Sequence, residues 1–329
     1  MEFKDLYQWW LVNGKPNREQ LRKMDCLPYG LSSRTIEAIL PKLNKEYNRL
    51  PNEVQTTRGA RRVVIASDFH SPFIDKEAVL LFLTFLKDTS PNELVLNGNV
   101  NDMSSFSNYP KIREVANAIK SSKQEREAWF GLAGAFRLAL PKSPIKYIGS
   151  QCHEGRMEKW VSLSPILAED DNYKIENWLK LSDYGIDFIP EVYDPIRQLD
   201  VSPTLDNPNS LQGSKLIITH GTVCRSKSGV SAMAEMEYNG VSTITAHTHR
   251  LSQVFKTTMR GTDTAVECGC MCRREPWYYL RGKRRLLDWQ QGFVVLNINE
   301  DGSYSTQLVP IMRDSEDKPF ISFGGEIWK

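Results

Sequence analysis

The chain has 329 residues, of which 40% are hydrophobic and 25% charged, and its formal net charge at pH 7 is +2. This composition indicates a soluble globular chain with a large core and about two domains. It contains no run of 18 apolar residues and no N-terminal signal pattern, so neither a membrane span nor secretion is expected. The six cysteines lack the spacing of a disulfide framework, which favours a cytoplasmic setting.

The first part of the chain differs from the rest in charge and pattern. Residues 1–62 hold 12 lysines and arginines against 7 acidic residues, a net charge of +5, whereas the remainder carries −3. Short helices are predicted over residues 5–12 and 17–24, and a third begins at Ser32 after Pro28 and Gly30. This outline is typical of a helix-turn-helix, which predicts a helical domain over residues 1–58. Two interpretations remain open: DNA binding, with Arg34 as a contact, or a cap that packs on the larger domain.

Strand-like apolar runs end in carboxylate, amide or imidazole side chains at five places, and these places hold all five histidines of the chain. Asp68 and His70 directly follow the run from Val63 to Ala66. Residues two apart on an extended segment point to the same side, so both side chains are expected to converge on one cation. An α/β fold gathers such strand ends at one edge of its sheet, which predicts a metal site there. An isolated Asp-x-His pair, in contrast, is more often an ordinary loop.

In chain order the five segments read Asp68-Phe69-His70, Gly98-Asn99-Val100-Asn101-Asp102, Gln151-Cys152-His153-Glu154, His220-Gly221 and Ala246-His247-Thr248-His249. Over roughly residues 62–250 this order and spacing resemble the calcineurin-like metallophosphoesterases. The turn Trp289-Gln290-Gln291-Gly292-Phe293 resembles that of virus-encoded members described as repair exonucleases. The resemblance implies a four-layer αββα sandwich over residues 59–329, a metal-dependent phosphoesterase activity and, for a viral protein, the host cytoplasm.

The resemblance also implies two divalent metal ions, of Mn, Zn or Fe, and assigns residues to them. The ligands implied for one ion are Asp68, His70, Asn99 and His249, and those for the other are Asn99, Cys152, His220 and His247. His153 is implied to act as the general acid and not as a ligand. Arg156 is a candidate phosphate contact because a guanidinium fork matches phosphate oxygens, and an ion pair with Glu154 or Glu158 is the alternative.

Two departures from the family pattern concern the metal ligands directly. Asn99 stands where the family has a bridging carboxylate, and two dications about 4 Å apart repel by about 15 kcal/mol at an effective dielectric of about 20. One ion is therefore expected to bind weakly unless hydroxide, substrate phosphate or a carboxylate such as Asp102 takes up the bridging role. Cys152 replaces an asparagine, and a thiolate beside His220 and His247 favours Zn²⁺.

Other elements follow from periodicity and capping. Asp75 is expected to cap a helix over residues 76–87, and residues 112–140 are predicted to be largely helical. Residues 166–212 indicate an irregular insertion, and residues 226–238 a core-facing helix. Alternation predicts strands over residues 253–258, 264–272, 292–299 and 304–311.

Within the 264–272 strand, the thiols of Cys268, Cys270 and Cys272 are expected to face one side. They form either a second metal or redox site or a set of small buried apolar groups. The next segment interleaves cations with aromatic rings, a pattern that can neutralise phosphates while rings stack on bases. A loop whose rings pack on the core explains it as well. The candidate nucleic-acid contacts in this segment are Arg273, Arg274, Trp277, Tyr278, Arg281, Lys283 and Arg284.

The sequence thus favours a metallophosphoesterase that hydrolyses phosphodiester bonds, with nucleic acid as the expected substrate and partner. A nucleic-acid-binding pseudoenzyme is the first alternative, because Asn99 and Cys152 alter the ligand set. A small-molecule phosphatase or cyclic-nucleotide phosphodiesterase is the second.

Overall fold

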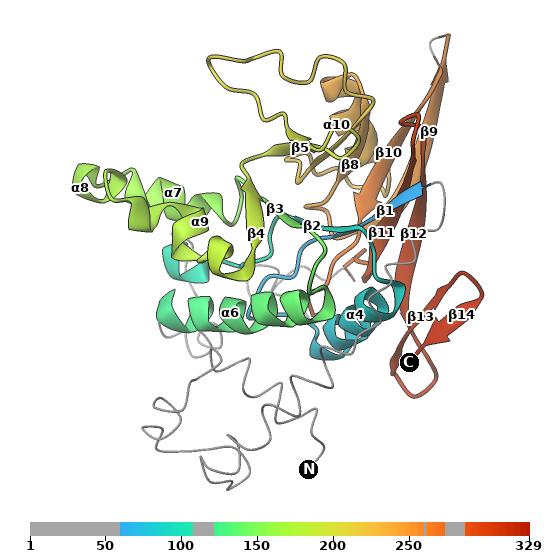
Figure 1. The fold of residues 1–329 in the computed structure, drawn as a ribbon, viewed down its shortest axis with the longest axis horizontal. Helices are drawn as coiled ribbons and strands as arrows, with labels where there is room; N and C mark the ends of the chain where they lie inside the picture. The colour runs from blue at the N-terminus through green and yellow to red at the C-terminus, as the bar shows by residue number, and fades with distance from the viewer. Residues whose placement is uncertain (1–59, 108–121, 260, 274–286) are drawn as a thin grey trace, which may run out of the picture.

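A computed structural model describes residues 60–107, 122–259, 261–273 and 287–329 (Figure 1). Two sheets form its centre. The larger has eight strands in the order β14-β13-β12-β11-β1-β2-β3-β4, and the smaller has six in the order β6-β5-β7-β8-β10-β9. The predicted helices of residues 1–58 and the domain boundary near residue 59 lie outside the described residues.

Strands β1 to β4 of the larger sheet run parallel, and β11 pairs antiparallel with β1. Their bounds are β1 Ala60–Ala66, β2 Glu93–Asn97, β3 Ile145–Ile148, β4 Ile186–Ile189, β11 Gly292–Asn299, β12 Tyr304–Arg313, β13 Pro319–Phe323 and β14 Glu326–Trp328. The smaller sheet has a parallel centre, β7 with β8 and β8 with β10. Its strands are β5 Val192–Asp194, β6 Leu199–Asp200, β7 Leu216–Thr219, β8 Ser242–Thr245, β9 Leu251–Thr258 and β10 Gly261–Cys268.

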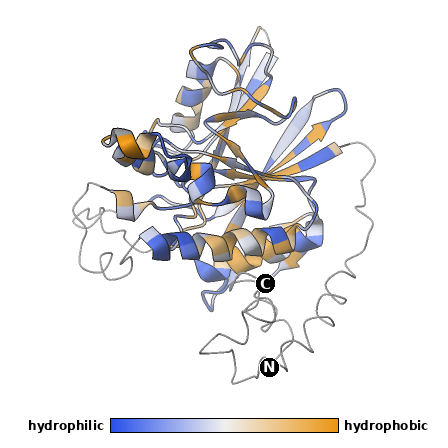
Figure 2. Ribbon diagram, turned by 60° about the vertical axis from the view of Figure 1, so that its left-hand side comes forward, coloured by the Kyte–Doolittle hydropathy of each residue, from blue (hydrophilic) through white to orange (hydrophobic). Residues whose placement is uncertain are grey.

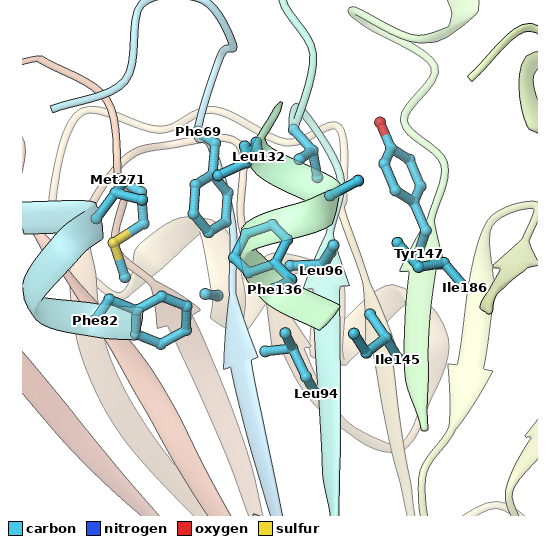
Figure 3. Packing of buried hydrophobic residues seen from close by; sticks show 14 of the residues in the cluster. Phe69, Phe82, Leu94, Leu96, Leu132, Phe136, Ile145, Tyr147, Ile186 and Met271 are labelled. Atoms are coloured by element: carbon cyan, nitrogen blue, oxygen red, sulfur yellow. The ribbon is translucent and has the colours of Figure 1, made fainter. Parts of the chain in front are cut away.

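Alternation along the strands divides the core into layers. Val64 and Ala66 of β1 face the helices α4 (Lys76–Thr89) and α6 (Ser122–Ala139), as does Leu94 of β2 (Figure 3). Val63 and Ile65 face the smaller sheet. Because successive side chains of a strand point to opposite faces, one apolar strand fills two layers of core. Figure 2 shows the apolar colouring following these central strands, while the helices carry both kinds of residue.

Helix α10 (Val230–Asn239) packs its Ala232 and Met236 against Ala265 on the outer face of the smaller sheet. The order is therefore helices, sheet, sheet, helix, and the predicted four-layer αββα sandwich is confirmed. Helix α4 begins at the predicted cap, since the Asp75 carboxylate accepts a hydrogen bond from the N–H of Ala78 at 3.1 Å. No helix in the described part of the chain is both long and apolar enough to cross a bilayer.

Two expectations about secondary structure were wrong. Residues 166–212 are only partly irregular: β4 extends the parallel sheet and β5 and β6 belong to the smaller one, whereas residues 201–212 contain no helix or strand. The remaining pieces there are short: α8 Pro165–Ala168, η3 Asp171–Tyr173, α9 Ile175–Trp178 and η4 Leu181–Tyr184. The end of α9 is held to α6 by the Trp129 indole N–H, which donates to the Leu179 carbonyl at 2.8 Å. Elements of three or four residues are too short to show a period in the sequence.

The second error concerns the cysteines. Strand β10 ends at Cys268, because Gly269 turns the chain with a φ of +80°. Cys268 lies in the core between the sheets, whereas Cys270 and Cys272 pack beside Phe73 and Trp289. The three thiols therefore do not share one side of a strand.

Candidate metal centre

The predicted ligand residues lie on turns that leave the carboxyl ends of β1, β2, β3, β7 and β8. Five of them have left-handed backbone conformations, with φ of 52° at Asp68, 51° at His70, 47° at Asn99, 67° at His247 and 60° at His249. Such conformations are costly for residues with a side chain, and they cluster at functional sites. Asp68 and His70 converge because of these turns, so the expectation of an extended segment was wrong in its geometry.

Gly98 shows how closely these turns approach one another. Its φ is +71°, and a Cβ at this position would lie 2.5 Å from Nδ1 of His220. Glycine alone fits there. The β2 turn and the β7 turn, which belong to different sheets, are therefore in direct contact.

Asp68, His70 and His249 form the first group, here called the Asp68 triad, and it has almost no exposed surface. Nε2 of His70 and Nε2 of His249 lie 3.5 and 3.2 Å from Oδ1 of Asp68. The two nitrogens are 3.1 Å apart. Ligands of a tetrahedral zinc ion with bonds of 2.0–2.1 Å are about 3.3 Å apart, so the triad has the spacing of one face of such a site.

Cys152, His220 and His247 form the second group, here called the Cys152 triad. Nδ1 of His220 donates to the carbonyl of Asn97 at 2.8 Å, which turns its Nε2 inward. That Nε2 is buried and has no hydrogen-bond partner among the described residues. An unpaired imidazole nitrogen costs free energy. A bound cation would satisfy it, and in the ion-free protein the negative charge of Cys152 offsets the cost. Sγ of Cys152 lies 3.6 Å from Nδ1 of His247, which is also compatible with a shared ion.

Asn99 stands between the two triads. Its Nδ2 donates to Oδ1 of Asp68 at 3.0 Å, and its Oδ1 accepts from the hydroxyl of Ser150 at 2.7 Å and the thiol of Cys152 at 3.0 Å. The amide therefore links the triads by hydrogen bonds and brings no negative charge. In this arrangement only the amide oxygen, on the Cys152 side, is placed to contact an ion.

His153 and Arg156 lie beside the Asp68 triad. The His153 ring packs edge-on against His70 at 4.5 Å between centroids, and its Nδ1 donates to the backbone carbonyl of Asp102 at 2.8 Å. Nη2 of Arg156 lies 3.3 Å from Nε2 of His153, while Nη1 donates to the same Asp102 carbonyl at 2.7 Å. The ion pair with Glu154 or Glu158, which was the alternative interpretation of Arg156, is not among its contacts with the described residues. Its guanidinium is held instead at the imidazole.

Asp102 does not take the bridging role considered for it. Its Oδ1 lies 3.0 Å from Nδ1 of His70, on the opposite side of that ring from Asp68. The side chain has no exposed surface. Asp102 thus orients the imidazole from behind, a contact that commonly fixes a metal-binding histidine.

Three buried glutamates hold the ligand-bearing turns, a role that was not predicted from the sequence. Glu154 accepts the consecutive N–H groups of Asn99, Val100 and Asn101 at 2.9–3.2 Å. Glu235 accepts two N–H groups of the turn after His220, and Glu267 accepts the Thr248 hydroxyl at 2.9 Å. Glutamates are usually exposed, so only tertiary contacts reveal them as structural acceptors.

Proton affinities in the site are strongly shifted. Burial raises the pKa of the Asp68 carboxyl, but His249 outweighs it and holds that pKa well below its usual value. Burial lowers the pKa of His70, yet hydrogen bonds to two aspartates raise it to about 9. Burial also lowers the pKa of His220, but the neighbouring Cys152 outweighs burial and raises this pKa to about 10. Burial raises the pKa of the Cys152 thiol, but His220 outweighs burial and holds this pKa well below its usual value. The two triads thus bring anionic ligands and bound protons together.

Of the eight candidate nucleic-acid contacts, only Arg273 belongs to the described residues. Its backbone N–H donates to the carbonyl of Phe73 at 3.1 Å, and its Nε lies 3.4 Å from the Ile74 carbonyl. The side chain is exposed. The other seven lie outside the described residues: Arg34, Arg274, Trp277, Tyr278, Arg281, Lys283 and Arg284.

Comparisons with known proteins relate the chain to bacteriophage proteins. No family model matches it. It is 27% identical over 283 residues to the Gene 54 protein of Mycobacterium phage D29, and 25% identical over 287 residues to that of Mycobacterium phage L5. Each alignment covers 82% of this chain and 99% of the relative. The expected likeness to virus-encoded proteins is borne out by these two relatives.

Solved structures with a similar arrangement have low sequence identity. Vps29 of Chaetomium thermophilum is 11% identical with a TM-score of 0.38, covering 82% of this chain and 96% of Vps29. Purple acid phosphatase PPD1 from yellow lupin (Lupinus luteus) seeds is 13% identical with a TM-score of 0.42, covering 79% of this chain and 52% of PPD1. The chemistry of the site has to be inferred from its own side chains.

The shifted histidines predict how metal binding depends on pH. A ligand imidazole must be neutral, so an ion at the Asp68 triad displaces the proton that His70 holds below a pKa of about 9. Zn²⁺ affinity should therefore rise about tenfold per pH unit between pH 6 and 8. Competition with a chromogenic chelator measures the affinity, and calorimetry in two buffers counts the released protons. An affinity unchanged over this range contradicts the assignment of His70.

Proposed function

We propose that this protein is a metal-dependent phosphoesterase that hydrolyses phosphodiester bonds in nucleic acid. The observation that carries the proposal is the meeting of two ligand triads from both sheets around one buried carboxylate, with His153 and Arg156 beside them. Carboxylate, imidazole and thiol donors at tetrahedral spacing fit Zn²⁺, and the unpartnered Nε2 of His220 fits an ion at the Cys152 triad.

The ions would be held by Asp68, His70 and His249 at one position, and by Cys152, His220 and His247 with Oδ1 of Asn99 at the other. When bound, they supply positive charge that neutralises phosphate oxygens and lowers the pKa of water. One of the two ions should bind more weakly than the other, because Asn99 contributes no negative charge between the two positions.

His153 and Arg156 supply the remaining chemistry. Nη2 of Arg156 lies 3.3 Å from Nε2 of His153, so Arg156 can bind a phosphate oxygen next to that nitrogen. Water that has given one proton to the solvent attacks phosphorus, and the bond from phosphorus to the departing oxygen breaks. Arg156 leaves Nε2 of His153 for the phosphate oxygen, so that nitrogen can carry the proton that His153 gives to the alkoxide. The Asp102 carbonyl, which accepts from Nδ1, keeps the ring in the orientation this transfer needs.

A second candidate function rests on Asn99. Its Nδ2 already donates to Asp68 and its Oδ1 already accepts from the Ser150 hydroxyl, so both ends of the amide have a partner without an ion. A protein with this centre can bind nucleic acid with metal support and without turnover.

Hydrolysis of a chromogenic phosphodiester with added Mn²⁺ or Zn²⁺ tests the enzymatic proposal. The unmodified protein should turn over. On a dinucleotide, whose leaving group is an alkoxide, His153→Ala should lower kcat by about 10²–10⁴-fold because that alkoxide loses its proton donor. Lys159→Ala is the matched control, since Lys159 is exposed on the same helix, α7 (Gly155–Val161). A silent protein that Asn99→Asp activates contradicts the enzymatic proposal and supports metal-assisted binding.

The nucleic-acid substrate is supported by the basic, aromatic segment that begins at Arg273, one residue after Cys272. Replacing Arg281, Lys283 and Arg284 by glutamine should weaken binding of single-stranded DNA and reduce its salt dependence by about 2 in log–log slope. Cleavage of the small diester should be unchanged.

The control for this experiment replaces three exposed lysines elsewhere on the protein, Lys142, Lys180 and Lys318. Fluorescence anisotropy at several salt concentrations gives the affinity and its slope. Equal losses in the two triple variants, or no loss in either, contradict the assignment of nucleic acid to this segment and favour a small-molecule substrate.

A further inference from the structure

Two thiols lie behind the Asp68 triad, and neither takes part in the proposed reaction. Sγ of Cys272 lies 3.7 Å from Nδ1 of His249, and Sγ of Cys270, Sγ of Cys272 and a ring nitrogen of His249 all lie within 4.8 Å of one another. The other nitrogen of that ring, Nε2, is 3.2 Å from Oδ1 of Asp68. The His249 ring therefore stands between the Asp68 triad and the thiol pair.

The backbone fixes the thiol pair in place. The N–H of Met271 donates to the carbonyl of Asp68 at 3.1 Å, and the N–H of Cys270 donates to the carbonyl of Gln290 at 3.1 Å. Cys272 forms an isolated bridge with Ile74, and Cys270 forms one with Gln291. The cysteine segment is thus held on one side by the turn that carries Asp68 and His70, and on the other by the turn before β11. A site built this way is formed before any ligand arrives.

The surroundings suit a cation bound by sulfur. Both cysteines have 0% exposed surface, and Phe73 and Trp289 pack against them. The Trp289 ring also contacts the ring of His249, at 4.1 Å between centroids. A charge enters such an environment only if its ligands neutralise it, and two thiolates neutralise one dication. Zinc bonds of about 2.3 Å to sulfur and about 2.05 Å to nitrogen place the two ligand atoms about 3.5 Å apart, close to the distance observed here.

We propose that Nδ1 of His249, Sγ of Cys270 and Sγ of Cys272 bind one thiophilic cation, Zn²⁺ or Cu⁺, at a position separate from the two triads. Binding displaces one proton from each thiol and, when an ion also occupies the Asp68 triad, the remaining ring proton of His249, which then binds both ions as an imidazolate. The ring of His249 then connects this ion to the Asp68 triad through its two nitrogens. The two thiolates place negative charge beside the Asp68 triad, where Asn99 contributes none.

Cobalt substitution tests the proposal without measuring activity, because Co²⁺ bound to thiolate has a charge-transfer absorption in the near ultraviolet. Cys152→Ser is the starting protein, since it removes the thiol of the other triad. Anaerobic titration with Co²⁺ should still produce the thiolate absorption. Adding Cys270→Ser and Cys272→Ser together should abolish it and lower the metal content measured by mass spectrometry by one ion per chain.

Cys268→Ser is the matched control, because this thiol is equally buried on the same segment but lies in the core between the sheets. It should keep the absorption. The protein is reconstituted with Zn²⁺ or with Cu⁺, each in competition with a chelator. The cation that stays bound is the one the site prefers. Absence of a thiolate absorption in the Cys152→Ser protein, or its persistence after both Cys270 and Cys272 are replaced, overturns the proposal. Circular dichroism checks that each variant is folded.

Discussion

The buried charge of Asp68 is the constraint on which the rest of the centre depends. The side chain has no exposed surface, so its two oxygens must be satisfied by groups from the surrounding turns. His70 and His249 face Oδ1, Asn99 donates to it, and the N–H of His247 donates to Oδ2 at 3.1 Å. These partners come from three different strand ends in two sheets. Placing one carboxylate at the junction therefore requires both sheets to be packed correctly.

The same turns explain why so much strain is concentrated in so few residues. Left-handed conformations at the ligand residues cost free energy, and the buried glutamates offset it by accepting the N–H groups of the turns. Glu154 holds the Asn99 turn, while Asp102 holds both His70 and His153. The side chains that contact a substrate or ion are thus supported by a second set that does not.

The sequence predicted which residues gather because alternating polar residues at strand ends are a local signal, and parallel strands bring those ends together. It also predicted the cap of α4 at Asp75. It missed β4, β13 and β14, and it placed Asp68 and His70 on an extended segment where the chain in fact turns. The contact between Cys272 and His249 could not be predicted either. The two residues are 23 positions apart, and only the fold brings Sγ of Cys272 within 3.7 Å of Nδ1 of His249.

Crystals grown with Zn²⁺ and measured at the zinc absorption edge test the central claim most directly, since anomalous scattering locates the ion independently of activity. The account predicts an anomalous peak about 2 Å from Oδ1 of Asp68 and from the Nε2 atoms of His70 and His249. No peak at that position, with the three side chains still hydrogen-bonded to one another, contradicts it.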